Sequence, residues 1–197
     1  MMPSLVTPMM TKRWQKICKM VGMPKPGTRT SKSLLAKYSF PKGWYSVYAT
    51  QPILLTNGGC SENYYFEISI GKMEGSLTFG FANKKQRKLF TKYKHHQNAG
   101  IYGYEKNGDL YNGTFSIIGG NLKYAYGVDD VVGVGVNLAS QQIIFTKNGQ
   151  HLASLLAHNF ADSSDSFLYP FVSLTKSGDE IEANFGPTFK FDLATLN

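Results

Sequence analysis

The chain has 197 residues, of which 42% are hydrophobic and 14% aromatic, which is enough to bury the core of one large domain. No apolar run reaches the roughly 18 residues that a membrane span needs, and the first residues lack the pattern of a signal peptide. The net charge of +8 is unevenly placed: residues 1–42 hold nine Lys/Arg and no Asp/Glu, and the rest holds twelve against thirteen, a balance of −1. Only two cysteines are present, Cys18 and Cys60, which favours a reducing compartment over a disulfide framework.

Residues 1–42 form a basic extension that is predicted to contain one short amphipathic helix. Thr7 is a suitable helix cap and Pro8 suits the first helical position. The apolar residues that recur at helical spacing are Met10, Trp14, Ile17, Cys18 and Val21. This stripe has two interpretations: it docks on the main domain, or the basic helix binds a membrane surface or an acidic partner.

From Gly43 onward the pattern is that of short strands separated by turns. Alternation in residues 64–70 places Phe66, Ile68 and Ile70 inward and Glu67 outward, and residues 76–81 repeat this period of two. The stretch from Gly127 to Gly149 reads as an antiparallel meander that ends in a tight turn at Asn148-Gly149. Its Gly133 and Gly135 are expected to let two sheets approach closely. Further strands are expected around 102–104, 110–111, 168–174 and 181–186, so the sequence predicts a β-sandwich.

Several of these segments, in order, resemble a SPRY (B30.2) domain of the Ran-binding-protein-M type. They are WYSVYATQPI, YYFEISI, LTFGFA, GYEKNGDLY, DVVGVGVNL, IIFTKNG, LYPFVSL and EANFGPTFKFDL. The secreted SPRY effectors of plant-parasitic nematodes resemble the chain as well, including the pair Arg13-Trp14. The resemblance covers residues 43–193 and leaves a tail at 194–197. Two departures are Asp129-Asp130, where the family usually has Gly-Asp, and an unusually basic segment at 84–96.

The resemblance implies a twisted two-sheet antiparallel sandwich, all-β, that binds another protein through loops at one end, without catalysis and without a cofactor. One wall of the implied site is Gln51, Pro52, Ile53 and Leu54. A second wall is Thr175, Lys176 and Ser177, and Tyr93 closes the rim. The chain is expected to act as a monomeric adaptor or effector in the cytoplasm or nucleus, which for a nematode effector would be that of a host cell.

The segment 84–96 carries a basic patch with three interpretations. Its charged members are Lys84, Lys85, Arg87, Lys88, Lys92 and Lys94. The patch is a solvated loop, a nuclear-targeting or acidic-partner surface, or a nucleic-acid contact in which Phe90 and Tyr93 stack on bases. No base-reading signature is present, so nucleic acid is the less favoured partner, and binding of this kind would be sensitive to salt.

The motifs of common enzymes and metal sites are missing from the sequence. There is no G-x-S-x-G motif and no Walker lysine, and Gly133-Val134-Gly135 is not followed by a third glycine. His95 and His96 are adjacent, so on a strand they would point to opposite sides. We therefore expect neither an enzyme nor a metal site.

Overall fold

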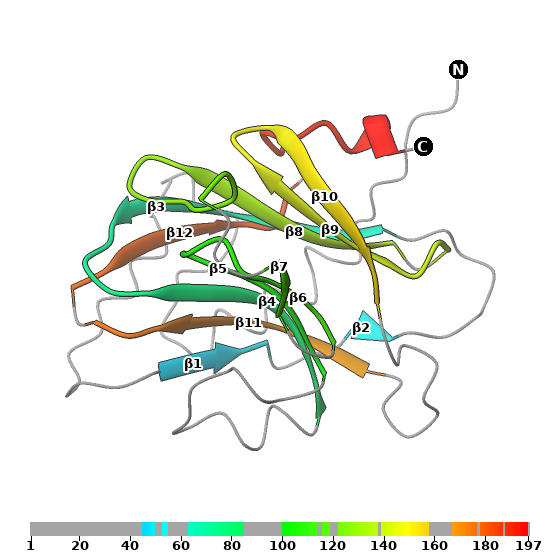
Figure 1. Ribbon diagram of the computed structural model, residues 1–197, viewed down its shortest axis with the longest axis horizontal. Coiled ribbons are helices and arrows are strands. Elements are labelled where there is room, and N and C mark those ends of the chain that lie inside the picture. The colour runs from blue at the N-terminus through cyan, green and yellow to red at the C-terminus, as the bar shows by residue number, and fades with distance from the viewer. Residues whose placement is uncertain are drawn as a thin grey trace, which may run out of the picture.

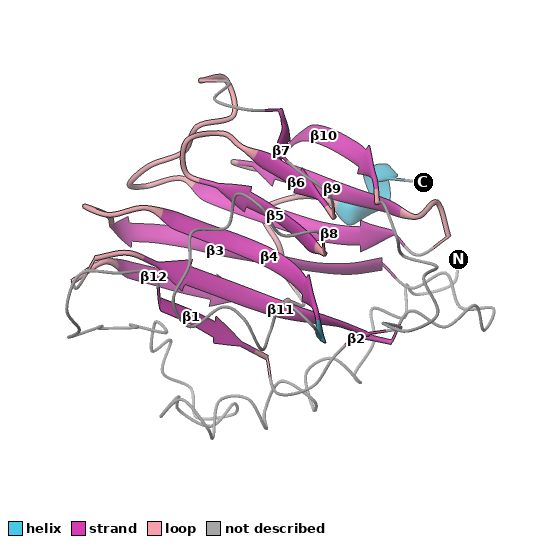
Figure 2. Ribbon diagram, turned by 60° about the horizontal axis from the view of Figure 1, so that its bottom comes forward, coloured by secondary structure: helices cyan, strands magenta, loops and turns pink. Residues whose placement is uncertain are grey.

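The computed structural model describes residues 45–49, 53–54, 63–84, 100–113, 116–118, 122–137, 139–157, 167–176, 178–186 and 188–196. Within these ranges the chain forms two antiparallel β-sheets that pack face to face (Figures 1 and 2). The predicted all-β sandwich is therefore confirmed. The helix predicted in residues 1–42 lies outside the described residues. No helix in the described part of the chain is long and apolar enough to cross a membrane.

The first sheet has seven strands, and β11 pairs with three of them, β1, β2 and β4. In spatial order it contains β1 (Tyr45–Tyr48), β11 (Phe167–Leu174), β4 (Leu77–Asn83), β5 (Ile101–Glu105), β6 (Leu110–Asn112) and β7 (Ser116–Ile118). The short strand β2 (Ile53–Leu54) also pairs with β11.

The second sheet has five strands and carries the predicted meander. Its order is β10 (Gln150–Leu156), β9 (Gln142–Lys147), β8 (Val131–Asn137), β3 (Asn63–Lys72) and β12 (Glu180–Asn184). A single 3-10 turn, η1 (Leu193–Leu196), closes the described part of the chain. The hairpin at Asn148-Gly149 is confirmed, since both residues have positive φ, 53° and 78°.

The core lies between the two sheets and follows the predicted alternation. Phe66 and Phe145, on β3 and β9, are 2% and 0% exposed and pack among residues of the facing sheet. Aromatic rings join the layers edge to face: the Phe145 centroid lies 5.9 Å from that of Tyr104, and the Phe66 centroid 5.6 Å from that of Phe81. Such pairs add about 0.5–1.5 kcal/mol to the burial of their apolar area.

The outer face of the five-stranded sheet is covered by the C-terminal segment, residues 188–191. Phe189 stands edge-on to Tyr65, with ring centroids 4.9 Å apart. Beneath them, Glu67 points outward as predicted but is only 3% exposed. Its carboxylate accepts hydrogen bonds from the backbone N–H groups of Lys190 and Phe191, both at 2.9 Å. Glu67 therefore ties the end of the chain to β3.

Gly133 and Gly135 belong to this same outer face, which corrects their expected role. A Cβ atom on Gly133 would stand 2.1 Å from the Tyr65 hydroxyl and 2.4 Å from Thr146 Oγ1. The two hydroxyls hydrogen-bond to each other at 2.6 Å, and Tyr65 also donates to Glu67 at 3.1 Å. Gly133 therefore makes room for this polar network and Gly135 for the ring of Tyr65. Neither faces the other sheet, because the alternating valines of β8 fill the core side.

Asp129-Asp130 stand where the family usually has Gly-Asp, and the structure shows how the turn forms without the glycine. Asp129 adopts φ 69°, in the left-handed region that glycine enters freely and Asp tolerates better than most residues. Asp130 accepts hydrogen bonds from Asn148 Nδ2 at 2.7 Å and from the Gly127 N–H at 2.9 Å, and pairs with Lys147 at 3.2 Å. The turn before β8 is thus held to the hairpin after β9 despite the missing glycine.

Four buried tyrosines predict how the fold responds to alkali. Burial raises the pKa of the phenols of Tyr65, Tyr104, Tyr111 and Tyr126 above their ordinary value of 10.0. In the unfolded chain these phenols ionise near pH 10, whereas in the folded chain they stay protonated. Their contribution to stability is therefore complete below about pH 10 and is lost progressively as the pH rises above it.

We expect these four phenols to ionise together with unfolding, in one cooperative step. Ultraviolet absorbance of tyrosinate and the far-ultraviolet β-sheet signal, followed in the same alkaline titration, check this. Gradual ionisation of all the tyrosines near pH 10 with an intact β-sheet signal would contradict it.

Candidate protein-interaction surface

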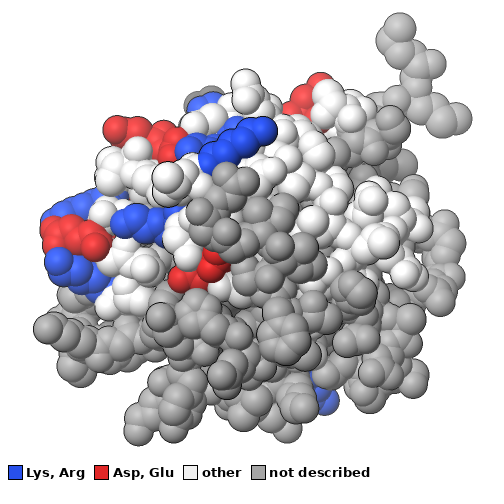
Figure 3. All heavy atoms as spheres, viewed as in Figure 1, with Lys and Arg blue, Asp and Glu red and all other residues white. Residues whose placement is uncertain are grey.

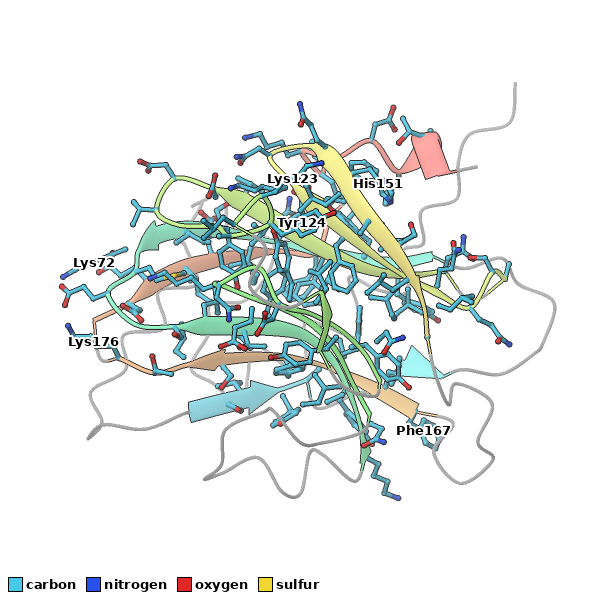
Figure 4. All side chains as sticks on the ribbon, viewed as in Figure 1. Lys72, Lys123, Tyr124, His151, Phe167 and Lys176 are labelled. Carbon is cyan, nitrogen blue, oxygen red and sulfur yellow. The ribbon has the colours of Figure 1, made fainter. Side chains whose placement is uncertain are left out.

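Strand β11 connects the two predicted walls of the site, because one wall pairs with its first residues and the other follows its last residue. Its first residues, Phe167 and Leu168, pair with Leu54 and Ile53. Its last residue is followed directly by Thr175. Seven residues of extended strand span about 23 Å. The structure therefore places the two predicted walls at opposite ends of the sandwich, as the labels of Phe167 and Lys176 in Figure 4 show. The two are called here the Phe167 end and the Lys176 end.

The Lys176 end is a pair of loops fastened to each other by hydrogen bonds. Asp179 is fully buried, and its carboxylate accepts the N–H groups of Glu74 at 2.7 Å and Gly75 at 3.2 Å. The Thr175 hydroxyl accepts the N–H of Ser76 at 2.6 Å. The resemblance places Thr175 in the binding site, but its hydroxyl is already hydrogen-bonded to the turn between β3 and β4. Polar contacts thus fasten this end, and the neighbouring Val128 is 49% exposed.

The exposed charges at the Lys176 end form ion pairs with one another. Glu74 pairs with Lys176 and, at 3.4 Å, with Lys72. The hydrogen bond and charge of Lys176 lower the pKa of Glu74, and the same contact raises the pKa of Lys176. All three side chains are about half exposed, so water and salt screen the pairs and their contribution to stability is small. Figure 3 shows basic and acidic side chains side by side at this end.

The Phe167 end presents apolar side chains instead. Phe167 is 37% exposed where β11 begins, and Leu156 is 64% exposed where β10 ends. The two residues belong to different sheets. The sheets are linked at this end by a hydrogen bond from Asn112 Nδ2 to the Leu156 carbonyl, 2.8 Å long. Neither apolar residue was predicted as part of the site, although the two flank the largely polar stretch 157–166, a pattern typical of a loop.

The end of β4 lies at the Phe167 end as well. Asn83 pairs with Leu168, and the exposed Lys84 follows it. The start of the basic patch thus lies at the same end as β2, across β11 from it. The other predicted residues lie outside the described part of the chain; they are Gln51, Pro52, Lys85, Arg87, Lys88, Lys92, Tyr93, Lys94 and Ser177. Of the first predicted wall, Ile53 and Leu54 are placed by their pairing with β11.

Among the described residues, no three His, Cys, Asp or Glu side chains gather in a way that could hold a metal ion. The buried carboxylates that are described serve the fold: Glu67 and Asp179 accept backbone N–H groups, and Glu105 accepts the Tyr111 hydroxyl at 2.7 Å. Their hydrogen bonds fix loops and strand edges to the sheets.

A rigid two-sheet scaffold with loops gathered at its ends is the architecture of a binding module, because side chains on such loops vary at little cost to the core. The SPRY domain family model matches residues 63–188 of this chain. The chain belongs to the SPRY domain family, whose domains are protein–protein interaction modules and are generally non-catalytic.

Relatives with the same domain come from distant organisms. The chain is 31% identical over 160 residues to Ran-binding protein 9 of Homo sapiens, covering 78% of this chain and 20% of that protein. It is 29% identical over 133 residues to the Ran-binding protein M homolog of Arabidopsis thaliana, covering 66% and 27%. It is 32% identical over 155 residues to the dual specificity protein kinase splA of Dictyostelium discoideum, covering 76% and 6%. The chain therefore spans less than a third of each of these relatives.

Solved structures share the fold. The SPRY domain of human HERC1 superposes with a TM-score of 0.55 at 17% identity, covering 75% of this chain and 86% of that one. A second human SPRY domain gives 0.54 at 19% identity, covering 77% and 91%.

Proposed function

We propose that the chain is an adaptor or effector that captures a segment of another protein through the Phe167 end. The interaction domain in this proposal is residues 43–193, with the basic extension 1–42 before it and the tail 194–197 after it. The observation that carries the proposal is the exposure of Phe167 and Leu156, one from each sheet, at the same end of the sandwich. The predicted wall residues Ile53 and Leu54 border the same end.

The difference between the two ends bears on binding energy. Interfaces are anchored by a few aromatic and apolar side chains that become fully buried on binding, and such anchors cost about 2 kcal/mol or more when removed. Half-exposed ion pairs such as Glu74–Lys176 contribute little and mainly affect the rate of encounter. A partner segment would therefore gain more from covering Phe167 and Leu156 than from contacting the Lys176 end.

The test compares exposed apolar residues at the two ends. Partner protein is captured from extract by the wild-type chain, identified, purified, and titrated against three variants. Phe167→Thr and Leu156→Thr keep strand propensity while removing apolar area. Val128→Thr is the matched control, since Val128 is 49% exposed beside Asp129 and Asp130, at the Lys176 end.

We expect the Phe167 and Leu156 variants together to raise Kd about thirtyfold, which corresponds to about 2 kcal/mol. The control should change Kd less than about twofold, and all variants should keep the melting temperature within a few degrees of wild type. Loss of capture on Val128→Thr or Lys176→Glu alone, with the Phe167 end dispensable, would refute the proposal.

The same experiment tests the nucleic-acid alternative based on the basic patch. Binding through phosphates falls steeply as salt rises, because each neutralised phosphate releases counterions. Capture by the Phe167 end should survive nuclease treatment and moderate salt. Capture that disappears under both would assign the function to the patch that begins at Lys84 and to the extension.

The setting of this activity is part of the proposal. We propose that the chain acts as a monomer in the cytoplasm or nucleus, of its own cell or, as a secreted SPRY effector, of a host cell. Two cysteines in 197 residues suit a reducing compartment. The names of the Ran-binding relatives support a protein partner.

A further inference from the structure

The outer face of the seven-stranded sheet carries a second apolar cluster, separate from the core. It lies on the side of the sheet opposite the sandwich interior, and its members come from five strands. These outer-face cluster residues are Tyr48, Ala82, Ile101, Tyr111 and Phe171.

The register gives the cluster its shape. One row across the sheet reads Tyr48, Phe171, Gly80, Gly103, Tyr111, each paired with the next. In this row two glycines thus separate the aromatic side chains of Phe171 and Tyr111. A Cβ on Gly80 would stand 2.2 Å from the Tyr102 carbonyl oxygen, and one on Gly103 would stand 2.8 Å from that of Phe79. No side chain therefore fits at either position, because the backbone of the next strand is too close.

The burial of this cluster shows that it is covered. Ala82, Ile101, Tyr111 and Phe171 are at most 3% exposed. Neighbouring strands flank these side chains, but the five-stranded sheet packs on the other face, where Phe79 and Phe81 meet Phe66. The C-terminal segment covers the outer face of the other sheet, through Phe189 and Tyr65. The cover of the cluster must therefore come from another part of the chain.

We propose that the outer-face cluster is the docking surface for the chain's own N-terminal extension, which contributes the apolar stripe of its predicted helix. Strand β1, which follows the extension, is the edge strand of this same sheet, and its Tyr48 is a cluster residue. Forty-four residues precede β1, which is ample length to cross the face. The stripe of Met10, Trp14, Ile17, Cys18 and Val21 offers apolar surface that can cover the cluster.

The extension carries nine Lys/Arg and no Asp/Glu, so its apolar stripe is the part that suits a buried contact. The basic segment 84–96 is a poorer candidate for the cover, because six of its 13 residues are Lys/Arg. With its stripe docked, the helix turns its lysines to water. The inference goes beyond the proposed function, because the cluster and the Phe167 end are different surfaces.

The experiment uses Trp14 as the reporter in the full-length chain. The chain has two tryptophans, so Trp44→Phe leaves Trp14 alone. In this background we expect Trp14 to be severalfold less accessible to acrylamide quenching than in the urea-unfolded chain. Ile17→Asp with Val21→Asp should raise quenching to the unfolded level and create a binding site for a hydrophobic dye. Lys16→Asp with Lys19→Asp, the same change on the opposite helix face, should do neither.

A second pair of variants locates the docking surface. Ile101→Thr removes apolar area from the outer-face cluster, and Ile144→Thr makes the same change on the outer face of the other sheet, where Ile144 is 3% exposed. We expect only Ile101→Thr to raise Trp14 quenching, with the β-sheet signal retained by both. Unhindered quenching of Trp14 in the wild-type background would overturn the proposal. Equal effects within either pair of variants would overturn it too.

Discussion

Replacing Phe145 by alanine is expected to lower the free energy of unfolding by about 3–5 kcal/mol, the range for truncating a buried phenylalanine. The side chain is fully buried between the sheets and meets Tyr104 edge to face. Its removal leaves a cavity that rigid strands on both sides cannot close. Chemical denaturation followed by far-ultraviolet circular dichroism measures the change directly.

Leu156→Ala is the matched control for this loss, since Leu156 is 64% exposed on the neighbouring strand β10. We expect its effect to stay within about 0.5 kcal/mol of wild type. A loss below about 1 kcal/mol for Phe145→Ala would contradict the inward orientation of this face of β9.

Replacing Glu67 by alanine is the second change with a large expected effect, about 3 kcal/mol or more. Glu67 accepts hydrogen bonds from the Tyr65 hydroxyl and from the N–H groups of Lys190 and Phe191. A buried donor that loses its partner costs about 1–3 kcal/mol. Alanine supplies no acceptor, so the two backbone donors of the C-terminal segment lose their partner at once, while the Tyr65 hydroxyl keeps Thr146. Part of that cost is recovered if the segment lifts and water enters.

Hydrogen exchange distinguishes these two responses. In Glu67→Ala the amides of residues 188–191 should exchange much faster, while those of β8 remain protected. Glu182→Ala is the control, because Glu182 is exposed on the neighbouring strand β12 and pairs with Ser69. It should leave both stability and exchange near wild type. Unchanged protection of residues 188–191 in Glu67→Ala would show that the aromatic contact with Tyr65 holds the segment without the carboxylate.

Alternation along the sequence predicted the core because each inward position follows from a period of two within one strand. Phe66, Ile68 and Ile70 lie inward as expected. The same rule placed Glu67 outward, but not the segment that buries it. That contact joins residues 124 apart, and nothing local to β3 encodes it. The prediction that Gly133 faces the other sheet was wrong for the same reason, because the side chains that require a glycine there, Tyr65 and Thr146, belong to other strands.

The candidate site was less accessible to sequence reasoning than the fold. Which end of the sandwich a loop occupies depends on strand direction and pairing, and motif order reveals neither. Ile53-Leu54 and Thr175-Lys176 were therefore assigned to one site, although β11 holds them at opposite ends. The exposed pair Phe167 and Leu156 was not predicted, because apolar residues at strand ends are ordinarily core.

The pairing of the first strands with the last has a consequence for how the chain is made. Ser46 on β1 contacts Ser173 on β11 across 127 residues, and β3 is completed by β12. At about 5–20 residues per second, a ribosome needs on the order of 6–25 s to synthesise that interval. During this time β1 and β3 each lack a neighbouring strand. The nascent chain therefore cannot complete either sheet until translation is nearly finished, and its early strands depend on chaperones or on their own solubility until then.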